Sequence, residues 1–153
     1  LCNTCPMTSP VDVTVEIDIG AAPADVAAVM FDPEREPQWM TAVTSVELID
    51  KALAPGARVR RKASVLGKDV GWTTEVERVH FPHLLVLRVT EGPFTGTIRY
   101  EIQRGPGGSH VTIQNVGQPA GLSFLPSAMI AAPMRTALTA DLGRLKSLVE
   151  SGV

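Results

Sequence analysis

The chain has few cysteines, few aromatic residues and almost no net charge. Its 153 residues contain two cysteines, Cys2 and Cys5, and only 5% of them are aromatic. Both cysteines lie in the first five residues, so the rest of the chain offers no thiol for a disulfide or a cysteine-based metal site. Their spacing is C-x-x-C, but no second pair accompanies it. We therefore expect no metal and no redox role, and a body without cysteine is typical of the reducing cytoplasm.

The charge narrows the class of partner. The chain has 14 basic and 16 acidic residues, a net charge of −2 at pH 7, and its longest basic run is Arg60-Arg61-Lys62. Sequence-independent nucleic-acid binding needs a concentrated basic surface, which this composition does not provide. No run of 18 apolar residues occurs, so no membrane-spanning helix is expected. We expect a small-molecule or protein partner, in a monomer or a homodimer.

The length of 153 residues predicts a single domain. Met7 looks like a natural start, and the first patterned segment follows it directly. We therefore expect residues 1–9 to be a leader or added sequence, and residues 10–153 to form the domain.

The spacing of apolar residues predicts a strand, two short helices, six more strands and a long helix. Residues 11–19 alternate strictly between apolar and polar side chains, as a half-buried strand does. Pro23 and Asp25 suit the first turn of a helix, and a second short helix over 34–40 carries Trp39. The further strands are expected over 43–50, 57–66, 71–79, 84–90, 94–103 and 110–116. Short turns separate them, including a glycine-rich turn at 105–108, so successive strands are expected to be antiparallel neighbours.

The last segment changes its apolar period from two residues to between three and four. Between 123 and 151 the apolar residues form one stripe, which predicts a single amphipathic helix. They are Ile130, Met134, Leu138, Leu142, Leu145 and Val149. Pro133 lies inside this helix and is expected to kink or restart it. Residues 117–121 are expected to form a flexible entrance loop before it.

Several short motifs stand in a fixed order along the chain. They are APADV at 22–26, DPEREPQW at 32–39, PGARV at 55–59, WTTEV at 72–76 and LLVLRV at 84–89. Together with the order of elements, they resemble the helix-grip fold of the START-like (SRPBCC) superfamily, which includes polyketide cyclase/dehydrase-like bacterial proteins. The resemblance covers roughly residues 10–151. It implies an α+β fold in which a curved antiparallel sheet of about seven strands wraps around the long C-terminal helix.

In such a fold, alternation predicts which side chains line a cavity between the sheet and the helix. The predicted wall is mostly apolar with few polar points, as in small-molecule sites. The expected lining residues are Trp39, Arg61, Ala63, Trp72, Thr74, Val76, Leu85, Leu87, Gly96, Ile98, Tyr100, Ile113, Asn115, Met129 and Met134. Gly96 is expected to leave space there, and Met129 and Met134 to form an adaptable lid. The alternative is that these side chains meet and fill the core.

Arg61 is the most unusual of these residues, because alternation places its guanidinium on an apolar face. A buried guanidinium needs an anionic partner, supplied by a ligand or by a carboxylate such as Glu75 or Glu101. The alternative is a bulge that turns Arg61 outward. Tyr100 and Asn115 also face inward, where they can donate hydrogen bonds to a ligand carbonyl or be satisfied within the core.

The sequence has no Ser-His-Asp order, P-loop, dinucleotide fingerprint or zinc signature, so no catalytic residue is assigned and no cofactor is expected. We expect the domain to bind or carry a hydrophobic small molecule, such as a lipid, a polyketide or another ring compound. One alternative, implied by the resemblance, is a polyketide cyclase, aromatase or dehydratase that uses the same cavity, with Arg61, Tyr100 and Asn115 acting in it. Another is a protein-interaction module of the antitoxin or stress-response type. The resemblance does not decide between them, because one fold hosts many functions.

Overall fold

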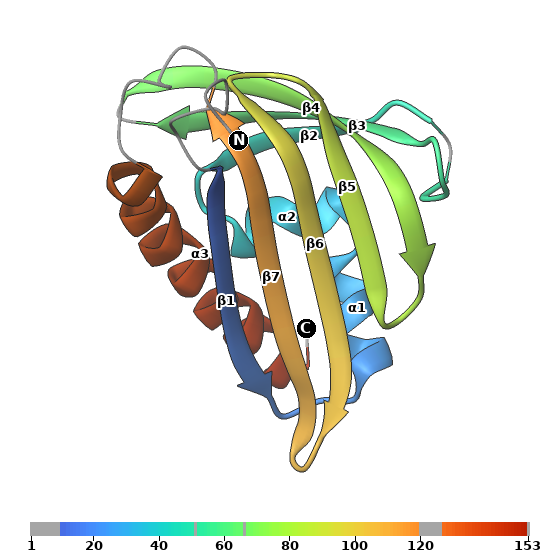
Figure 1. Cartoon of the computed structure of the whole chain (residues 1–153). Coiled ribbons are helices and arrows are strands. Elements are labelled where there is room, and N and C mark those ends of the chain that lie inside the picture. The colour runs from blue at the N-terminus through green and yellow to red at the C-terminus, as the bar shows by residue number, and fades with distance from the viewer. Residues whose placement is uncertain (1–9, 51, 66, 120–126, 153) are drawn as a thin grey trace, which may run out of the picture.

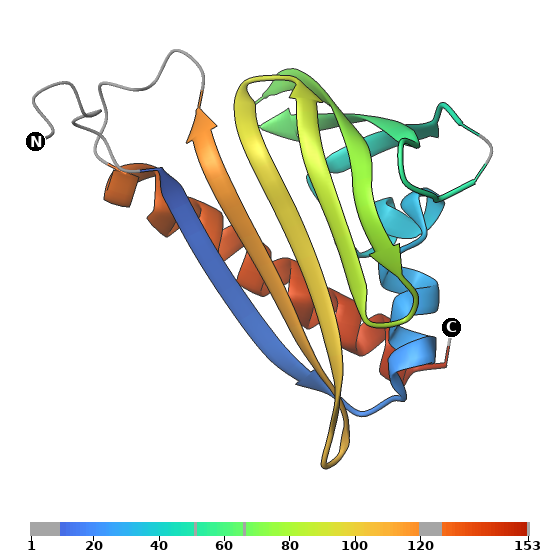
Figure 2. The same ribbon diagram turned by 45° about the vertical axis from the view of Figure 1, so that its right-hand side comes forward.

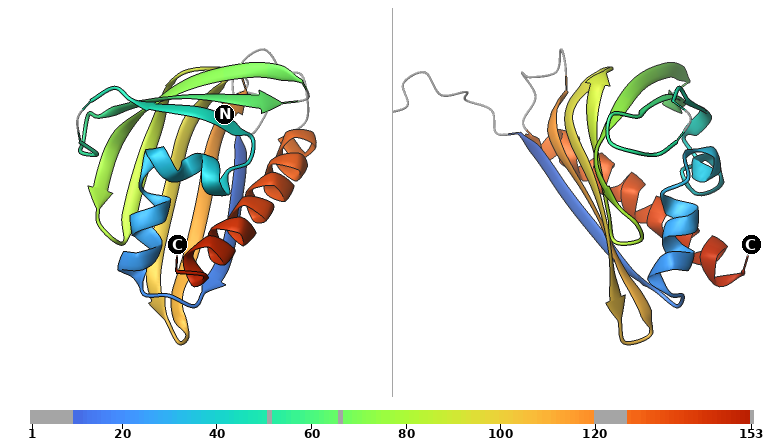
Figure 3. Two further views of the ribbon diagram at one scale, coloured as in Figure 1. Left: turned by 180° about the vertical axis from the view of Figure 1, so that it is seen from behind. Right: turned by 90° about the vertical axis from the view of Figure 1, so that its right-hand side faces the viewer.

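The computed structural model describes residues 10–50, 52–65, 67–119 and 127–152. A seven-stranded antiparallel sheet, with strand order β1-β7-β6-β5-β4-β3-β2, bends around one long helix (Figures 1 and 2). The elements are β1 (Val11–Ile19), α1 (Pro23–Met30), η1 (Pro33–Arg35), α2 (Glu36–Trp39), β2 (Val43–Leu48), β3 (Arg58–Val65), β4 (Lys68–His80), β5 (Leu84–Glu91), β6 (Phe94–Gly105), β7 (Gly108–Pro119) and α3 (Ser127–Glu150). All the helices lie on the same side of the sheet (Figure 3). The predicted α+β fold class is confirmed.

The first helical segment forms where the sequence signals place it. Pro23 stands in the first turn of α1, where a missing backbone N–H costs nothing. The buried residues of α1 are Pro23, Val26, Ala27, Val29 and Met30. Asp32 then starts the short turn η1, since its Oδ1 accepts a hydrogen bond of 3.0 Å from the Glu34 backbone N–H. The following helix α2 carries Trp39 into the core, where that side chain is fully buried.

Four strands, β4 to β7, are longer than the sequence predicted, and β4 and β7 differ most. β4 begins at Lys68 rather than at 71, because Lys68 is already paired with Val65 of β3. β7 spans Gly108–Pro119, where 110–116 was predicted, because β6 pairs with it along that whole length. Residues 117–119 therefore belong to β7, and the entrance loop expected over 117–121 is wrong for these three residues. Residues 120 and 121 lie outside the described residues.

Helix α3 is continuous across Pro133, so the predicted restart does not occur. Proline lacks the N–H that would bond the carbonyl four residues earlier, which here belongs to Met129. Both residues are exposed, and water can therefore satisfy the freed carbonyl. The buried residues of α3 are Leu138, Leu142, Leu145 and Val149, whereas Ile130 and Met134 are half-buried.

Two further expectations from the sequence concern the N-terminal residues and the absence of a membrane-spanning helix. The expectations for residues 1–9, including those for Cys2 and Cys5, fall outside the described part of the chain. Within the described part, no helix is both long enough and apolar enough to span a membrane. This agrees with the absence of an 18-residue apolar run in the sequence.

Candidate ligand-binding site

Strand pairing fixes which residues lie side by side on the inner face of the sheet, because paired residues in antiparallel strands point to the same side. One row runs from β4 to β1 through Val76, Leu87, Ile98, Asn115 and Val13. The neighbouring rows are Val89, Gly96, Gly117 and Val11 on one side, and Leu85, Tyr100, Ile113 and Val15 on the other. Thr74 of β4 pairs with Val89 and joins that row, so nine of the predicted lining residues share one face of the sheet.

One part of this face is accessible while its surroundings are buried. The half-buried positions are Val89, Gly96, Ile98, Asn115 and Gly117, and together they form what we call the open patch. In the same rows, Val76 and Leu87 toward β4 are each 2% exposed, and Val11 and Val13 on β1 are 2% and 0% exposed. In the next row, Tyr100 and Ile113 are 4% and 0% exposed. The accessible area therefore lies in the middle of the sheet rather than at an edge.

Met134, in the N-terminal half of α3, contacts the open patch at Asn115. Met134 Sδ is 3.9 Å from Asn115 Nδ2, and Ile130 and Met134 are partly buried against the core. Met129, which was expected to belong to the lid, is instead 63% exposed. It precedes Ile130 by one residue and is therefore rotated by about 100° around the helix, away from the buried stripe. Of the two predicted lid methionines, only Met134 contacts the sheet side.

Arg61 is buried as alternation predicted, and it forms an ion pair inside the protein. Its Nε and Nη2 donate to the two carboxylate oxygens of Glu36 at 2.7 and 2.8 Å, and its Nη1 donates to Thr74 Oγ1 at 2.7 Å. The side chains of Arg61 and Glu36 are 5% and 4% exposed. Burial alone would lower the pKa of Arg61, but the hydrogen bonds and charge of Glu36 outweigh it and hold that pKa above its ordinary value.

The partner of Arg61 is not one of the carboxylates suggested from the sequence. Glu75 pairs with Arg88, and Glu101 pairs with Arg99, so neither reaches Arg61. Glu36 lies three residues before Trp39, and residues three apart share one face of a helix. Because Trp39 was expected in the core, that spacing was the available signal that Glu36 also points inward.

Tyr100 and Trp39 form an aromatic wall beside this ion pair. Their ring centroids are 6.2 Å apart in an edge-to-face arrangement, and Phe31 lies 6.4 Å from Tyr100. Burial raises the pKa of the Tyr100 hydroxyl, and the nearby Glu36 charge raises it further. The hydroxyl therefore stays protonated at neutral pH. Trp39 is 0% exposed, and its Nε1 has no hydrogen-bond partner among the residues that the structure describes.

Gly96 does not leave open space in the way that was expected from the sequence. Its φ is +144°, and a Cβ built on it would lie 2.0 Å from the Val116 carbonyl oxygen and 2.6 Å from Gly117 Cα. The glycine is needed because β6 and β7 approach each other closely at this point. A larger residue at 96 would push against the backbone of β7 instead of filling a cavity.

The other predicted lining residues belong to the packed wall around the open patch. Ala63, Thr74, Val76, Leu85, Leu87 and Ile113 are all buried. Trp72 is half-buried, and it pairs across the strands with Arg61. Asn115 is the polar member of the open patch itself. The structure thus brings Ile98, Asn115 and Met134 together at the accessible area, and it places Arg61 and Tyr100 in the closed wall.

The sequence matches a known family along this whole fold. Residues 10–150 match the family model described as polyketide cyclase / dehydrase and lipid transport. The chain belongs to this family. No curated protein gives a significant sequence match.

Solved structures support the family assignment at the level of the fold. A START superfamily protein from Mycobacterium smegmatis is 18% identical with a TM-score of 0.78, and the match covers 95% of this chain and 99% of that one. The protein TTHA0849 from Thermus thermophilus is 21% identical with a TM-score of 0.79, covering 92% and 98% of the two chains. At such identities the likeness concerns the fold, and the family membership indicates a fold that binds hydrophobic ligands.

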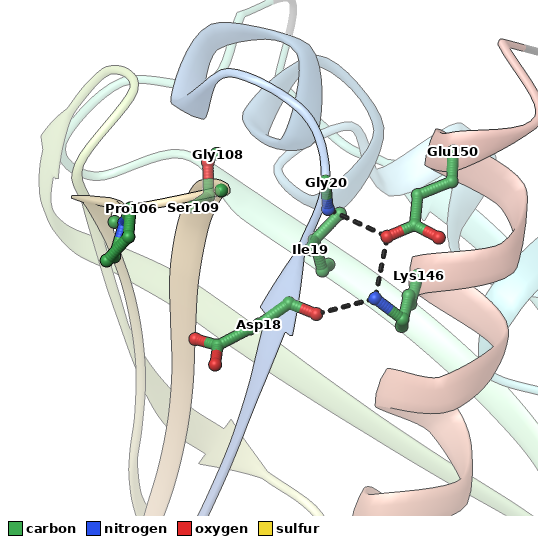
Figure 4. A pocket seen from close by; sticks show the side chains of 10 residues that line it. Asp18, Ile19, Gly20, Pro106, Gly108, Ser109, Lys146 and Glu150 are labelled. Carbon is green, nitrogen blue, oxygen red and sulfur yellow. Dashed lines mark hydrogen bonds and ion pairs between the residues drawn. The ribbon is translucent and has the colours of Figure 1, made fainter.

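A surface pocket lies near the C-terminal end of α3, and none of its lining residues belongs to the open patch (Figure 4). This surface pocket of about 330 Å³ lies between the β1 end, the β6–β7 turn and the last turns of α3. Glu150 Oε2 accepts from Gly20 N–H at 2.7 Å and from Lys146 Nζ at 2.6 Å, and Lys146 also donates to the Asp18 carbonyl at 2.9 Å. These polar groups are hydrogen-bonded to one another, and their hydrogen bonds connect the last turns of α3 to the end of β1. Among the described residues, no group of three or more His, Cys, Asp or Glu could hold a metal ion.

Proposed function

We propose that this member of the family binds a hydrophobic small molecule between the open patch and the N-terminal half of α3. The observation that carries the proposal is the exposure pattern of the inner face. Ile98 is half-buried, although it is flanked in its row by Leu87 and lies next to Tyr100 on β6, both nearly fully buried. An apolar side chain left partly accessible in the middle of a buried face supports an interior site for an apolar ligand.

The affinity scale follows from the area that such a ligand removes from water. Burying about 500 Å² of apolar ligand surface contributes roughly 12 kcal/mol, from which immobilisation of the ligand removes about 4 kcal/mol or more. A free energy of about −8 kcal/mol corresponds to a micromolar Kd. We therefore expect lipids, polyketides or other ring compounds to bind in the micromolar range.

The arrangement of charges favours binding over catalysis. Arg61, the strongest candidate for stabilising an enolate in a cyclase-type reaction, has three of its donors bonded to Glu36 and Thr74. The buried Tyr100 hydroxyl is held protonated and does not serve as a base at neutral pH. Two of the three groups expected to act in an enzyme, Arg61 and Tyr100, therefore already belong to the closed wall of the site.

Titration with 1-aminoanthracene, an apolar fluorescent dye, tests the proposal. Ile98→Trp places a large ring over the open patch and should weaken dye binding at least tenfold while the protein stays folded. Thr97→Trp is the matched control, because Thr97 is the adjacent residue of β6 and points to the other face. The proposal fails if the unmodified protein does not bind the dye, or if the two variants bind it equally.

A further inference from the structure

Asn115 is the polar side chain of the open patch, on the side nearest to β1. It lies on β7, paired with Ile98 of β6 on one side and with Val13 of β1 on the other. Ile113, two residues away on the same face, is fully buried. Asn115 is thus an amide set among aliphatic side chains, on the part of the inner face that remains accessible.

Only one end of the Asn115 side-chain amide has a hydrogen-bond partner among the described residues. Its Nδ2 donates weakly to Met134 Sδ at 3.9 Å, and its Oδ1 is buried without a hydrogen-bond partner among the described residues. The preceding residue shows the contrast, because Gln114 Nε2 donates to Asp12 Oδ1 at 3.1 Å on the outer face. A buried amide oxygen with no partner lowers stability, by an amount equivalent to about a fivefold to hundredfold change in an equilibrium constant.

Trp39 Nε1 is the other buried polar atom without a partner among the described residues, and it differs in access. Trp39 is 0% exposed and lies in the closed wall between α2 and Tyr100. Asn115 is half-buried, and its Nδ2 contacts Met134, a flexible side chain that is itself half-buried. A molecule entering over the open patch therefore reaches Asn115 by displacing Met134, whereas it does not reach Trp39.

From this arrangement we infer that Asn115 Oδ1 accepts a hydrogen bond from a neutral hydroxyl of the bound molecule. This inference rests on the proposed function and specifies its ligand class as apolar compounds that carry an alcohol or a phenol. The polarity is the reverse of the sequence-based expectation, in which Asn115 donates to a ligand carbonyl. The free end of the amide is its acceptor, so the ligand must supply the donor.

The surroundings of Asn115 select against charged donors and acceptors. A carboxylate has no proton to donate and would face the amide oxygen with like partial charge. An ammonium group would lose its hydration among Ile98, Val13 and Met134 without a compensating anion, because the carboxylate of Glu36 is already bonded to Arg61. A neutral hydroxyl satisfies the oxygen at the smallest desolvation cost.

Two probes of nearly equal shape test the inference. We would measure the Kd of 2-naphthol, which donates a hydrogen bond, and of 2-methoxynaphthalene, which cannot. One hydrogen bond to a buried acceptor should make the protein bind 2-naphthol about threefold to tenfold more tightly than the ether. Asn115→Leu should remove this preference, whereas Gln114→Leu, on the outer face of the same strand, should keep it.

The melting temperature of the unliganded variants provides a second readout. Asn115→Leu removes an unpartnered polar group from an apolar setting, so its melting temperature should stay equal to that of the parent protein or rise. A clear fall would mean that the amide has a structural role, and it would overturn the inference. Equal affinity of the parent protein for both naphthalenes would also overturn it while leaving the proposed function intact. If neither compound binds the parent protein, the proposed function fails as well.

Discussion

The two halves of α3 cover the same sheet in different ways. In the C-terminal half, Leu142 and Leu145 are 1% and 0% exposed, and Arg144 Nε donates to the Trp39 carbonyl at 3.0 Å. In the N-terminal half, Ile130 and Met134 are only half-buried, and Met129 is exposed. One helix therefore closes one end of the interior and only partly covers the other.

The difference arises from side-chain size on both sides of the interface. The first 11 residues of α3, 127–137, include four alanines, and Met134 among them contacts Asn115 of the open patch, which also contains Gly96 and Gly117. The second half contributes Leu138, Leu142 and Leu145, which belong to one buried core cluster with large sheet residues such as Ile102 and Ile113. The same amphipathic stripe of α3 is therefore tightly packed where large side chains meet, and only partly packed where the side chains are small.

Of the changes considered, removing the charge of Arg61 should lower the stability of the fold most. Arg61→Met strands the Glu36 carboxylate inside the wall, and we expect the free energy of unfolding to fall by about 3–5 kcal/mol. The double variant Arg61→Met, Glu36→Leu removes both charges and should recover most of this loss. Urea unfolding of the parent protein and both variants measures it. A loss below about 1 kcal/mol in the single variant would mean that water reaches the pair.

The two halves of α3 should also differ in their response to truncation. Leu142→Ala opens a cavity in the closed end and should cost about 2–5 kcal/mol. Ile130→Ala, on the same stripe in the N-terminal half, should cost less than about 1.5 kcal/mol, because its side chain is only partly removed from water. Denaturant midpoints of the two variants make the comparison. Equal losses would show that the two halves pack equally well.

The elements and their faces could be predicted from the sequence, whereas the pairing of individual groups could not. Alternation placed Arg61, Tyr100 and Asn115 on the inner face, because a strand has a fixed period of two residues. It did not predict Glu36, because that residue reaches Arg61 from a separate helix across 25 positions of the chain.

Gly96 and Asn115 show the same limit in the candidate site. Gly96 was expected to leave space, but its backbone is pressed against β7, which depends on how the sheet bends. The free end of the Asn115 amide depends on where Met134 lies across the interior. Contacts between distant segments decide both properties, and no local pattern records them.

The smallest effect is expected at the outer surface of the closed end, from the pH dependence of His110. The Nδ1 atom of His110 lies 2.7 Å from Asp18 Oδ1, and its Nε2 atom lies 3.7 Å from Glu16 Oε2. The pKa of His110 is raised, mainly because of the hydrogen bond to Asp18. A raised pKa in the folded state stabilises the protein below about pH 6.5, the unfolded value, and this stabilisation is lost as pH rises through the folded value. The side chains of Glu16 and Asp18 are largely exposed and that of His110 is 36% exposed, so we expect this stabilisation to be less than about 1 kcal/mol. Unfolding of His110→Gln at pH 5.5 and pH 8.5 should show a smaller difference than the parent protein does. If the variant keeps the full pH difference in stability, groups other than His110 are responsible for it. If the variant also changes the affinity for the dye, the contacts at this end of the sheet are coupled to the open patch, and the two ends of the interior are not independent.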